Sequence, residues 1–474
     1  MESRRSFLSK IGLASAGAFL SPSLEAMILK KEKLKVALVG TGVRGSSFFG
    51  KNLVKTYPGE IEFVGLCDIN PGRLAYAKKN MGVSCPTFVD FDKMIGKTKP
   101  DLILVATTDA THDEYIVKAL ENDIDVMTEK PMTTDEHKCQ AIIEAERKSK
   151  KKVIVSFNYR WAPYYTKIKE LISSGEIGDL VSIDFNWMLN NYHGASYFRR
   201  WHGLEHMSGG LWVHKATHHF DLLNWWVNSD PEEVHAYGAL EHYGHNGPFR
   251  GDNCRTCPHK NKCQYHWEIT PGSHYDKLYT RNEHYDGYVR DNCLFREEIN
   301  IHDKMSAQVK YKNNVVANYS LTTYSPYEGV RIAFNGRKGR IEAWHGIPFM
   351  NKEAISQADM HKQEMMQGED NHHYKPLVLH RNFEKHEVIN VKEEKGGHGG
   401  GDKRIMNKIF KHPNSPDPLN HCAGTRDGAM SILIGIAARR SVERNRPVKI
   451  EELTDLRPRE ERIIQKVVGP ERNS

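Results

Sequence analysis

The chain has 474 residues, of which 67 are Lys or Arg and 60 are Asp or Glu, so its formal net charge is +7. This length favours two or three domains over one compact core. Basic and acidic residues are mixed along the whole chain, which gives no basic patch for a phosphate backbone, so nucleic acid is not an expected partner. No apolar run approaches the ~20 residues that a membrane span needs, which excludes a polytopic membrane protein.

The N-terminal residues 1–32 have the order of an export signal and a linker. Arg4 and Arg5 belong to the pattern S-R-R-x-F-L-x-K, and a short run rich in Gly, Ala and Ser, residues 11–20, precedes Pro22. A charged start, an apolar run and a chain breaker are typical of a secretory signal, and the arginine pair resembles a twin-arginine signal. We therefore expect a periplasmic protein that uses the twin-arginine export machinery and has no membrane span in its mature chain.

Residues 33–157 are predicted to form an NAD-binding Rossmann domain. The apolar residues 34–39 predict a strand, and the motif G-x-G-x-x-G follows at residues 40–45, ahead of a segment suited to a helix. Its glycines allow a tight turn and a close approach of backbone N–H groups to a diphosphate at the helix N-terminus. The cofactor contacts that we expect on this turn are Gly40, Gly42, Val43, Arg44 and Gly45.

Asp68 follows a second predicted strand, residues 61–66. A carboxylate at this place accepts hydrogen bonds from both ribose hydroxyls and repels a 2′-phosphate, so the sequence favours NAD over NADP. Arg73 lies close enough in sequence to keep the NADP alternative open. Two more predicted strands, residues 102–106 and 124–128, alternate with helical segments, which is typical of a doubly wound parallel sheet and of the α/β class.

The motif Glu129-Lys130-Pro131 follows the fourth of these strands. Here the chain resembles the family of glucose–fructose oxidoreductase, inositol dehydrogenase and MocA (Gfo/Idh/MocA). In that family the lysine of E-K-P lies beside the nicotinamide and the reacting carbon, and the resemblance assigns this place to Lys130. A partly desolvated lysine there lowers the pKa of a substrate hydroxyl as hydride leaves. The further cofactor contacts that we expect are Thr107, His112, Glu129 and Lys130.

The resemblance extends into residues 158–440, for which it implies an α+β domain with a large open mixed or antiparallel sheet that binds substrate and forms a homo-oligomer. The segment 209–221 resembles the family pattern G-G-x-x-x-D-x-x-x-H-x-x-D. The family's histidine then falls on His218 and its aspartate on His214, which departs from the pattern. We expect His218 to act as the base, helped by His214 and Lys215, with Lys130 as the further catalytic residue; a different proton path is the alternative. The substrate contacts that we expect are Arg160, Trp161, Lys215 and His218.

The rest of this domain is predicted from patterning. Alternating segments between residues 307 and 334 predict antiparallel strands. Residues 423–441 predict a long helix and residues 441–474 a charged tail. A glycine-rich stretch at residues 396–401 predicts a loop, in which His398 either contacts a polar ligand or only completes the loop.

A polar insert, residues 242–297, contains four of the eight cysteines of the chain. Two cysteines separated by two residues on a turn are able to hold tetrahedral zinc, and a segment without an apolar core gains stability from such a site. We favour structural zinc, while disulfides and an iron–sulfur cluster remain alternatives. The predicted ligands are Cys254, Cys257, Cys263 and Cys293, with His266 in reserve.

The sequence therefore predicts an NAD-dependent oxidoreductase that moves hydride between nicotinamide and a secondary alcohol of a sugar, cyclitol or glycoside. An alternative is a glycosidase that oxidises a sugar transiently, eliminates the aglycone and returns the hydride to a bound NAD. A third alternative, a non-catalytic binding protein, is disfavoured because Lys130 and His218 are both present. The sugar, the oxidised carbon and the net direction are not specified by any of these motifs.

Replacing Arg4 and Arg5 together by Lys is expected to leave active protein in the cytoplasm, because the arginine pair is the part of the signal that the export machinery reads. Cell fractionation followed by an activity assay measures this. Continued delivery of the double variant to the periplasm would contradict the assignment of the signal.

Overall fold

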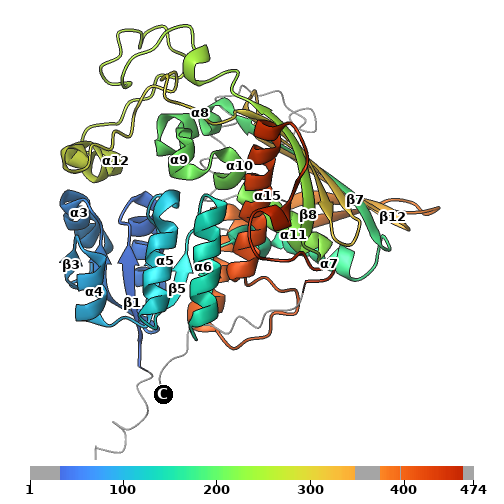
Figure 1. Cartoon of the computed structure of the whole chain (residues 1–474), viewed down its shortest axis with the longest axis horizontal. Coiled ribbons are helices and arrows are strands. Elements are labelled where there is room, and N and C mark those ends of the chain that lie inside the picture. The colour runs from blue at the N-terminus through green and yellow to red at the C-terminus, as the bar shows by residue number, and fades with distance from the viewer. Residues whose placement is uncertain (1–31, 347–373, 395–396, 463–474) are drawn as a thin grey trace, which may run out of the picture.

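The structure, a computed structural model, describes residues 32–346, 374–394 and 397–462. Within these residues the chain forms two sheets that share a layer of helices (Figure 1). The predicted export signal lies outside the described residues, apart from its last position. No helix in the described part of the chain is both long and apolar enough to cross a lipid bilayer.

The first domain is a Rossmann fold, as the sequence predicted. Its described strands are all parallel and have the order β3-β2-β1-β4-β5-β6, in which the direction of winding reverses at β1, so ligands bind beyond the carboxyl ends of the strands near this point. The strands are β1 (Leu34–Val39), β2 (Ile61–Cys67), β3 (Thr87–Phe88), β4 (Leu102–Val105), β5 (Asp125–Thr128) and β6 (Val153–Val155). The main helices are η1 (Arg44–Asn52), α2 (Leu53–Thr56), α3 (Pro71–Met81), α4 (Phe91–Thr98), α5 (His112–Glu121) and α6 (Glu136–Lys148).

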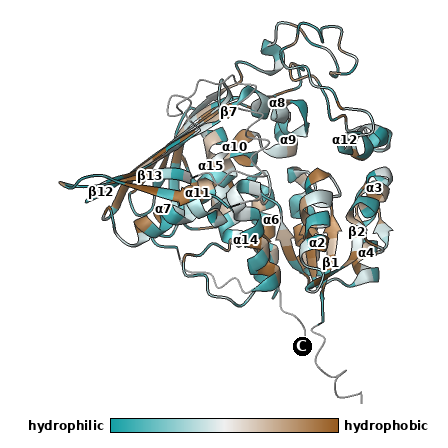
Figure 2. Cartoon of the chain, turned by 180° about the vertical axis from the view of Figure 1, so that it is seen from behind, coloured by the Kyte–Doolittle hydropathy of each residue, from teal (hydrophilic) through white to brown (hydrophobic). Residues whose placement is uncertain are grey.

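Local chemistry explains where these helices begin and end. The side chain of Asn70 accepts the Arg73 N–H at 2.9 Å, and Pro71 occupies the first turn of α3. The same helix ends at Gly82, whose φ of +71° favours glycine. The helices show hydrophobic and hydrophilic stretches alternating along their length (Figure 2), as expected for helices with one face on the sheet. The central strand β4 and the last four residues of β1 are buried on both faces, which explains their unbroken apolar runs.

The second domain contains a mixed sheet with the strand order β14-β13-β12-β11-β7-β10-β9-β8-β15 among the described residues. The predicted strands between residues 307 and 334 are confirmed as β9, β10 and β11, and β10 pairs in parallel with β7. The strands are β7 (Leu180–Asn190), β8 (Pro231–Ala239), β9 (Lys304–Tyr311), β10 (Val316–Ser325), β11 (Gly329–Gly336), β12 (Gly339–His345), β13 (Tyr374–Arg381), β14 (Glu387–Lys392) and β15 (Val448–Lys449).

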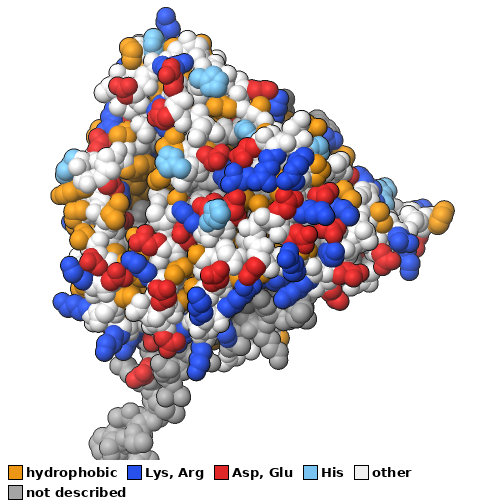
Figure 3. Space-filling view, viewed as in Figure 1, with side chains coloured by type: hydrophobic (Ala, Val, Ile, Leu, Met, Phe, Trp, Pro, Cys, Tyr) orange, Lys and Arg blue, Asp and Glu red, His pale blue; other side chains and the backbone are white. Residues whose placement is uncertain are grey.

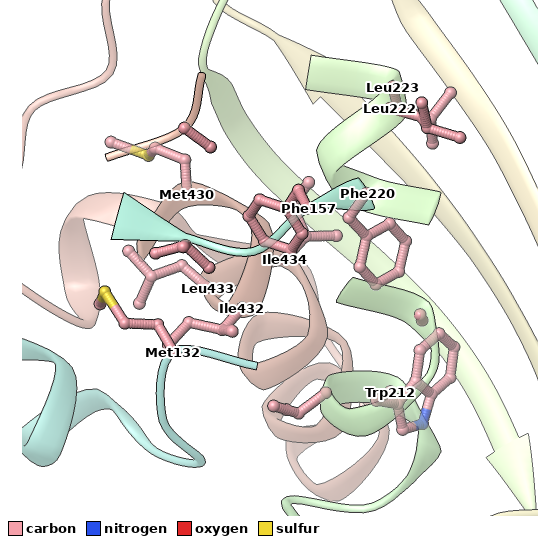
Figure 4. Packing of buried hydrophobic residues seen from close by; sticks show 14 of the residues in the cluster. Met132, Phe157, Trp212, Phe220, Leu222, Leu223, Met430, Ile432, Leu433 and Ile434 are labelled. Atoms are coloured by element: carbon pink, nitrogen blue, oxygen red, sulfur yellow. The ribbon is translucent and has the colours of Figure 1, made fainter. Parts of the chain in front are cut away.

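Buried and exposed residues alternate strictly along β9, so one face of this sheet packs on helices while the other lies open. The helices that cover the packed side or lead into it are α7 (Pro163–Ser173), α8 (Asn191–Arg199), α9 (Glu205–Ser208), α10 (Leu211–His214), α11 (Ala216–Val227), α14 (Gly401–Met406) and α15 (Thr425–Arg444). The core is continuous between the two domains. Met132 and Phe157 from the first domain pack near Leu433 and Ile434 of α15 (Figure 4).

The segment predicted as a charged tail is structured as far as residue 462. Val448 of β15 pairs with Val234 at the edge of the second sheet. Arg462 forms ion pairs with Asp230 at 3.2 Å and with Asp427 at 2.8 Å. The high charge of this segment therefore reflects buried ion pairs as well as solvated residues. Residues 441–462 of the predicted charged tail thus contact the second domain through β15 and these ion pairs.

The insert extends over the carboxyl ends of the strands of the first sheet. Asn253 and Asn292 form an isolated antiparallel bridge near its ends. Its far part contains α12 (His274–Leu278) and η6 (Thr280–Tyr285), which lie above α3 (Figure 1). A polar insert of the second domain thus contacts the cofactor-binding edge of the first.

A buried guanidinium links three elements at the junction of the domains. Arg160, on η3 (Asn158–Trp161), has 1% of its side chain exposed and lies 2.5 Å from Asp221 of α11 and 2.9 Å from Asp427 of α15. Burial raises the pKa of Asp221 to about 6 even with the arginine beside it. Burial also opposes ionisation of Asp427, but Arg462 and Arg160 outweigh it and lower its pKa to about 2. The network therefore depends on the arginine for charge balance.

Arg160→Met is expected to lower the free energy of unfolding by about 3–5 kcal/mol, because it leaves buried carboxylates without their shared partner. Chemical denaturation monitored by tryptophan fluorescence measures this. Arg337→Met is the matched control, since its ion pair with Asp179 has side chains 75% and 88% exposed and is expected to change stability by less than about 1 kcal/mol. Equal losses for the two variants would contradict the structural role of Arg160.

Candidate active site

The glycine motif forms a turn that leaves no room for side chains. Gly40 has a φ of +88°, and a Cβ there would lie 2.5 Å from the backbone of Ala106 on the neighbouring strand's end. A Cβ on Gly45 would lie 1.9 Å from the carbonyl oxygen of Gly40. Strand, turn and helix therefore approach each other as closely as a dinucleotide cradle requires. Val43 and Arg44 follow at the start of η1, so the predicted contacts of this turn lie together.

Asp68 lies directly after β2 and faces this turn. Its Oδ2 accepts the N–H of Thr41 at 2.8 Å and the hydroxyl of Thr41 at 2.9 Å, while its Oδ1 accepts the N–H of Asn70 at 2.9 Å. Arg73 forms an ion pair with the same carboxylate at 3.0 Å. Arg73, the residue that left NADP as an alternative cofactor in the sequence analysis, is therefore paired with Asp68. The donor set of the turn and the carboxylate at its edge fit an adenosine diphosphate group with free ribose hydroxyls.

Arg44 and Glu129 connect the glycine turn to the E-K-P segment. The Arg44 guanidinium forms an ion pair with Glu129 and lies 3.6 Å from the centre of the Phe48 ring. Asp402, at the start of α14, is 3.4 Å from the same guanidinium. These contacts hold the Glu129 carboxylate against η1, directly before Lys130 in the chain.

Thr107 and His112 lie on the loop and helix that follow β4. The hydroxyl of Thr111 donates to that of Thr107 at 2.9 Å. Nδ1 of His112 lies 2.8 Å from the carbonyl oxygen of Pro131, and burial lowers the pKa of this histidine. The uncharged His112 ring therefore hydrogen-bonds to the segment that contains the cis Lys130–Pro131 peptide bond.

Lys130 is the centre of the site. Its Nζ donates to the carbonyl oxygen of His214 at 3.1 Å, which joins the first domain to the second. Burial lowers the pKa of Lys130 to about 8, while Asp109 and Glu129 act in the opposite direction. The positive charge of this ammonium therefore depends on pH in the mildly alkaline range, which is typical of a perturbed group in an active site.

His214 is paired with a carboxylate that the sequence analysis missed. Its Nδ1 lies 2.5 Å from Oδ2 of Asp109, a buried residue of the loop after β4. Burial lowers the pKa of His214 well below its usual value and raises that of Asp109, so the pair holds a neutral imidazole. The family's aspartate is thus absent from position 214, and the imidazole that stands there contacts a carboxylate of the first domain instead. The signal in the sequence was an acidic residue, Asp109, within residues 107–112, directly after a predicted strand of the Rossmann domain.

His218 lies one turn further along, on α11, where α10 and α11 meet at Lys215. Its ring stacks on Tyr159 with centres 4.3 Å apart and an interplanar angle of 11°. Its Nδ1 has no hydrogen-bond partner among the described residues, and burial lowers its pKa well below the usual value. An uncharged, buried imidazole with a free nitrogen is suited to accept a proton. Lys215 donates to the Tyr159 hydroxyl at 3.3 Å, which places a second ammonium beside this ring.

The structure does not bring all predicted substrate contacts together. Arg160 is held in its ion-pair network, so its charge is already balanced within the protein. Trp161 is 9% exposed and stacks on His421 with ring centres 4.7 Å apart. His398 lies closer to the site, with its ring centre 6.1 Å from that of His218 and its Nδ1 3.1 Å from Asp402.

The four cysteines of the insert line one small pocket, together with His266 and Arg199. All four are free thiols. No group of three or more His, Cys, Asp or Glu side chains in the described part of the chain is arranged to hold a metal ion, so the zinc prediction is not supported. Two of the sulfurs instead accept hydrogen bonds, Cys254 from Arg199 at 3.8 Å and Cys293 from the N–H of Phe295 at 3.4 Å.

Comparison with known families identifies the two domains. Residues 34–157 match the "Oxidoreductase family, NAD-binding Rossmann fold" and residues 169–450 match the "Oxidoreductase family, C-terminal alpha/beta domain". The chain belongs to the Gfo/Idh/MocA family. It is an enzyme of the oxidoreductase class, as predicted.

Individual relatives agree with this assignment. The chain is 40% identical over 445 residues to YteT of Bacillus subtilis (strain 168), described by its name as an oxidoreductase, covering 88% of this chain and 98% of that protein. It is 28% identical over 205 residues to inositol 2-dehydrogenase of Salmonella typhimurium (strain LT2), covering 43% of this chain and 57% of that protein.

Solved structures show the same fold at low identity. A levoglucosan dehydrogenase in complex with NADH and levoglucosan has a TM-score of 0.61 at 15% identity, covering 88% of this chain and 100% of that one. An aldose-aldose oxidoreductase from Caulobacter crescentus has a TM-score of 0.58 at 14% identity, with the same coverage of 88% and 100%.

Proposed function

We propose that this Gfo/Idh/MocA oxidoreductase is an NAD-dependent dehydrogenase that acts on a secondary alcohol of a sugar, cyclitol or glycoside. The observation that carries the proposal is the contact of Lys130 with His214 across the domain boundary, with the buried imidazole of His218 one turn further along. The inositol and levoglucosan dehydrogenases among its relatives support a polyhydroxylated, sugar-like substrate. When bound, the nicotinamide supplies hydride acceptance and donation.

Lys130 provides the charge that the reaction needs. As an alcohol carbon loses hydride, its hydroxyl must lose a proton, and the oxygen carries negative charge in between. A buried ammonium stabilises this charge more strongly than a solvated one, because the surrounding dielectric is low. The carbonyl oxygen of His214 orients Nζ through one hydrogen bond and leaves its other protons for the substrate.

His218 is the proposed proton acceptor. Its burial keeps it neutral and its stacking on Tyr159 holds the ring plane. His214 is the proposed neighbour that shapes the site, because Asp109 already engages its Nδ1. Lys215, bonded to Tyr159, adds a positive charge that favours loss of the proton from substrate.

We also propose that the protein works in the periplasm after twin-arginine export and that it associates with copies of itself. The arginine pair at Arg4 and Arg5 supports the first proposal. The open face of the second sheet, in which alternate residues of β9 are exposed, supports the second. Figure 3 shows acidic and basic side chains interspersed over one face of the molecule, so neither sign of charge dominates there.

A panel of sugars, cyclitols and glycosides, incubated with the protein and NAD, tests the proposed activity. We expect reduced nicotinamide to accumulate with at least one polyol or sugar, because the hydride leaves the substrate for the cofactor. Measuring the released aglycone in the same reactions separates the two predicted chemistries. Aglycone release without net reduction would favour the glycosidase alternative, and no reaction with any member would contradict both.

Turnover in the direction of alcohol oxidation is expected to fall as the pH rises through about 8, where Lys130 loses the proton that balances the alkoxide. Lys130→Arg retains a positive charge at all these pH values, so the falling limb of the pH profile is expected to disappear or to move to higher pH.

Lys130→Met and His218→Ala are each expected to lower kcat by ~10²–10⁴-fold, with a smaller loss for His214→Ala.

Steady-state pH profiles and NAD titrations of each variant check these expectations. Lys93→Met is the matched control, since the side chain of Lys93 is 80% exposed and far from the catalytic groups in sequence. NAD affinity is expected to stay nearly unchanged in all of these variants. A larger loss for His214→Ala than for His218→Ala would reverse the two roles.

A further inference from the structure

The far part of the cysteine-containing insert lies against the first domain. Residues 274–290, called the strap below, include α12 and η6 and lie above α3 (Figure 1). The strap contacts the first domain at four points. These contacts are Tyr279 Oη with the Val43 N–H at 2.8 Å, Asn282 O with Asn70 Nδ2 at 2.8 Å, Asp286 with Arg73 at 2.5 Å and His274 Nδ1 with Tyr76 Oη at 2.9 Å.

These contacts fall on the diphosphate turn and on the adenosine side of the predicted dinucleotide site. Val43 belongs to the glycine turn after β1, and the other three partners lie after β2 and along α3. In a Rossmann domain the diphosphate meets the first turn and the adenosine ribose meets the end of the second strand. The strap therefore covers the diphosphate and adenosine end of the predicted cofactor site, and not its nicotinamide end.

Tyr279 occupies the most informative position. Its hydroxyl accepts the N–H of Val43, a donor that the glycine turn presents to a diphosphate. A hydroxyl that accepts one hydrogen bond keeps its own proton as a donor, which suits a phosphate oxygen. The Tyr279 ring is 6% exposed and lies 4.8 Å from the Arg290 guanidinium, so it is held in place.

Asp286 sets the charge at the ribose end. Arg73 lies between Asp68 at 3.0 Å and Asp286 at 2.5 Å, and all three side chains are largely buried. Two carboxylates and one guanidinium leave a net charge of about −1 at this place. A 2′-phosphate is repelled by this arrangement, whereas free ribose hydroxyls find acceptors.

The surfaces of the strap and the first domain are closely matched. A Cβ added to Gly72 of α3 would lie 2.1 Å from Oδ1 of Asn282. Asn282 is itself bonded to the carbonyl oxygen of Lys277 at 2.8 Å and so has little freedom to move away. Glycine at position 72 thus permits the strap to approach α3.

We propose that the strap is the outer wall of the dinucleotide site. In this arrangement Tyr279 contacts the diphosphate, Asp286 rejects the 2′-phosphate of NADP through Arg73, and the closed strap makes NAD a slowly exchanging cofactor. The inference rests on the proposed function for the identity of the dinucleotide. It assigns cofactor contacts to a segment of the second domain more than 200 residues from the glycine turn, as the separation of 236 residues between Val43 and Tyr279 shows.

The first test measures cofactor retention. Tyr279→Phe is expected to raise the dissociation rate of NAD about tenfold, the effect of one hydrogen bond to a charged group. Tyr275→Phe, on the exposed side of the same strap, is the matched control and is expected to behave like the parent protein. The rate is measured by displacing bound NADH with excess NAD and following nucleotide fluorescence. Equal rates for the two variants would overturn the retention role.

The second test measures selectivity and closure. Asp286→Asn is expected to raise the affinity for NADP relative to NAD by about tenfold in calorimetric titrations, because one repelling charge is removed. Gly72→Ala is expected to speed NAD dissociation without touching the cofactor, whereas Gly96→Ala, which has open space around its Cβ, is expected to have no effect. An unchanged NADP to NAD ratio and an unaffected Gly72→Ala would overturn the proposal.

These binding measurements separate the strap from the catalytic proposal. A parent protein that binds NAD slowly and reversibly but oxidises no sugar would contradict the proposed function alone. Thermal denaturation of each variant shows whether a faster dissociation reflects loss of the strap contact or loss of folding. Variants that release NAD quickly while keeping the parent midpoint support the strap.

Discussion

The arrangement of the proposed catalytic residues depends on the ion pairs of the buried Arg160 guanidinium. This guanidinium attracts Asp221 of α11 and Asp427 of α15 at the point where the chain leaves the Rossmann domain. Asp221 lies one turn beyond His218, so this ion pair determines where that imidazole sits. Tyr159, the residue before the arginine, stacks on His218 from the same segment. Charge balance inside the core therefore positions the proposed base, because separating these groups leaves carboxylates buried without a partner.

The second consequence is that neither domain holds a complete site. Asp109 and Lys130 come from the first domain, and both contact His214 from the second, one at its ring and the other at its carbonyl oxygen. Dry surroundings lower the pKa of the lysine and keep the imidazoles neutral, which is the protonation pattern that alcohol oxidation needs. Asp109 thus brings a carboxylate from across the domain boundary to His214, the residue at the family's aspartate position.

Features with a local signal were predictable from the sequence. The buried strands and the glycine turn follow from apolar runs and from backbone geometry, and Lys130 and His218 follow from motifs at matching places. Asp109 was missed because its contact with His214 spans 105 residues and joins two segments without periodic patterning. Arg160 was assigned to the substrate because a motif does not show whether a charge is paired inside the core. The contact of the insert with the first domain was not predictable either, because a polar segment has no hydrophobic pattern that indicates what it packs against.

The second domain contacts the predicted cofactor site at both of its ends. Helices α10 and α11 meet the E-K-P segment at the reacting end, and the strap meets the glycine turn and α3 at the other. In the arrangement proposed for the strap, the cofactor exchanges only when the strap separates from α3, so turnover faster than exchange requires the bound nicotinamide to be reoxidised in place. A second carbonyl compound that enters the same site accepts the hydride from this nicotinamide during fast turnover, while slower turnover proceeds through cofactor exchange and releases reduced nicotinamide.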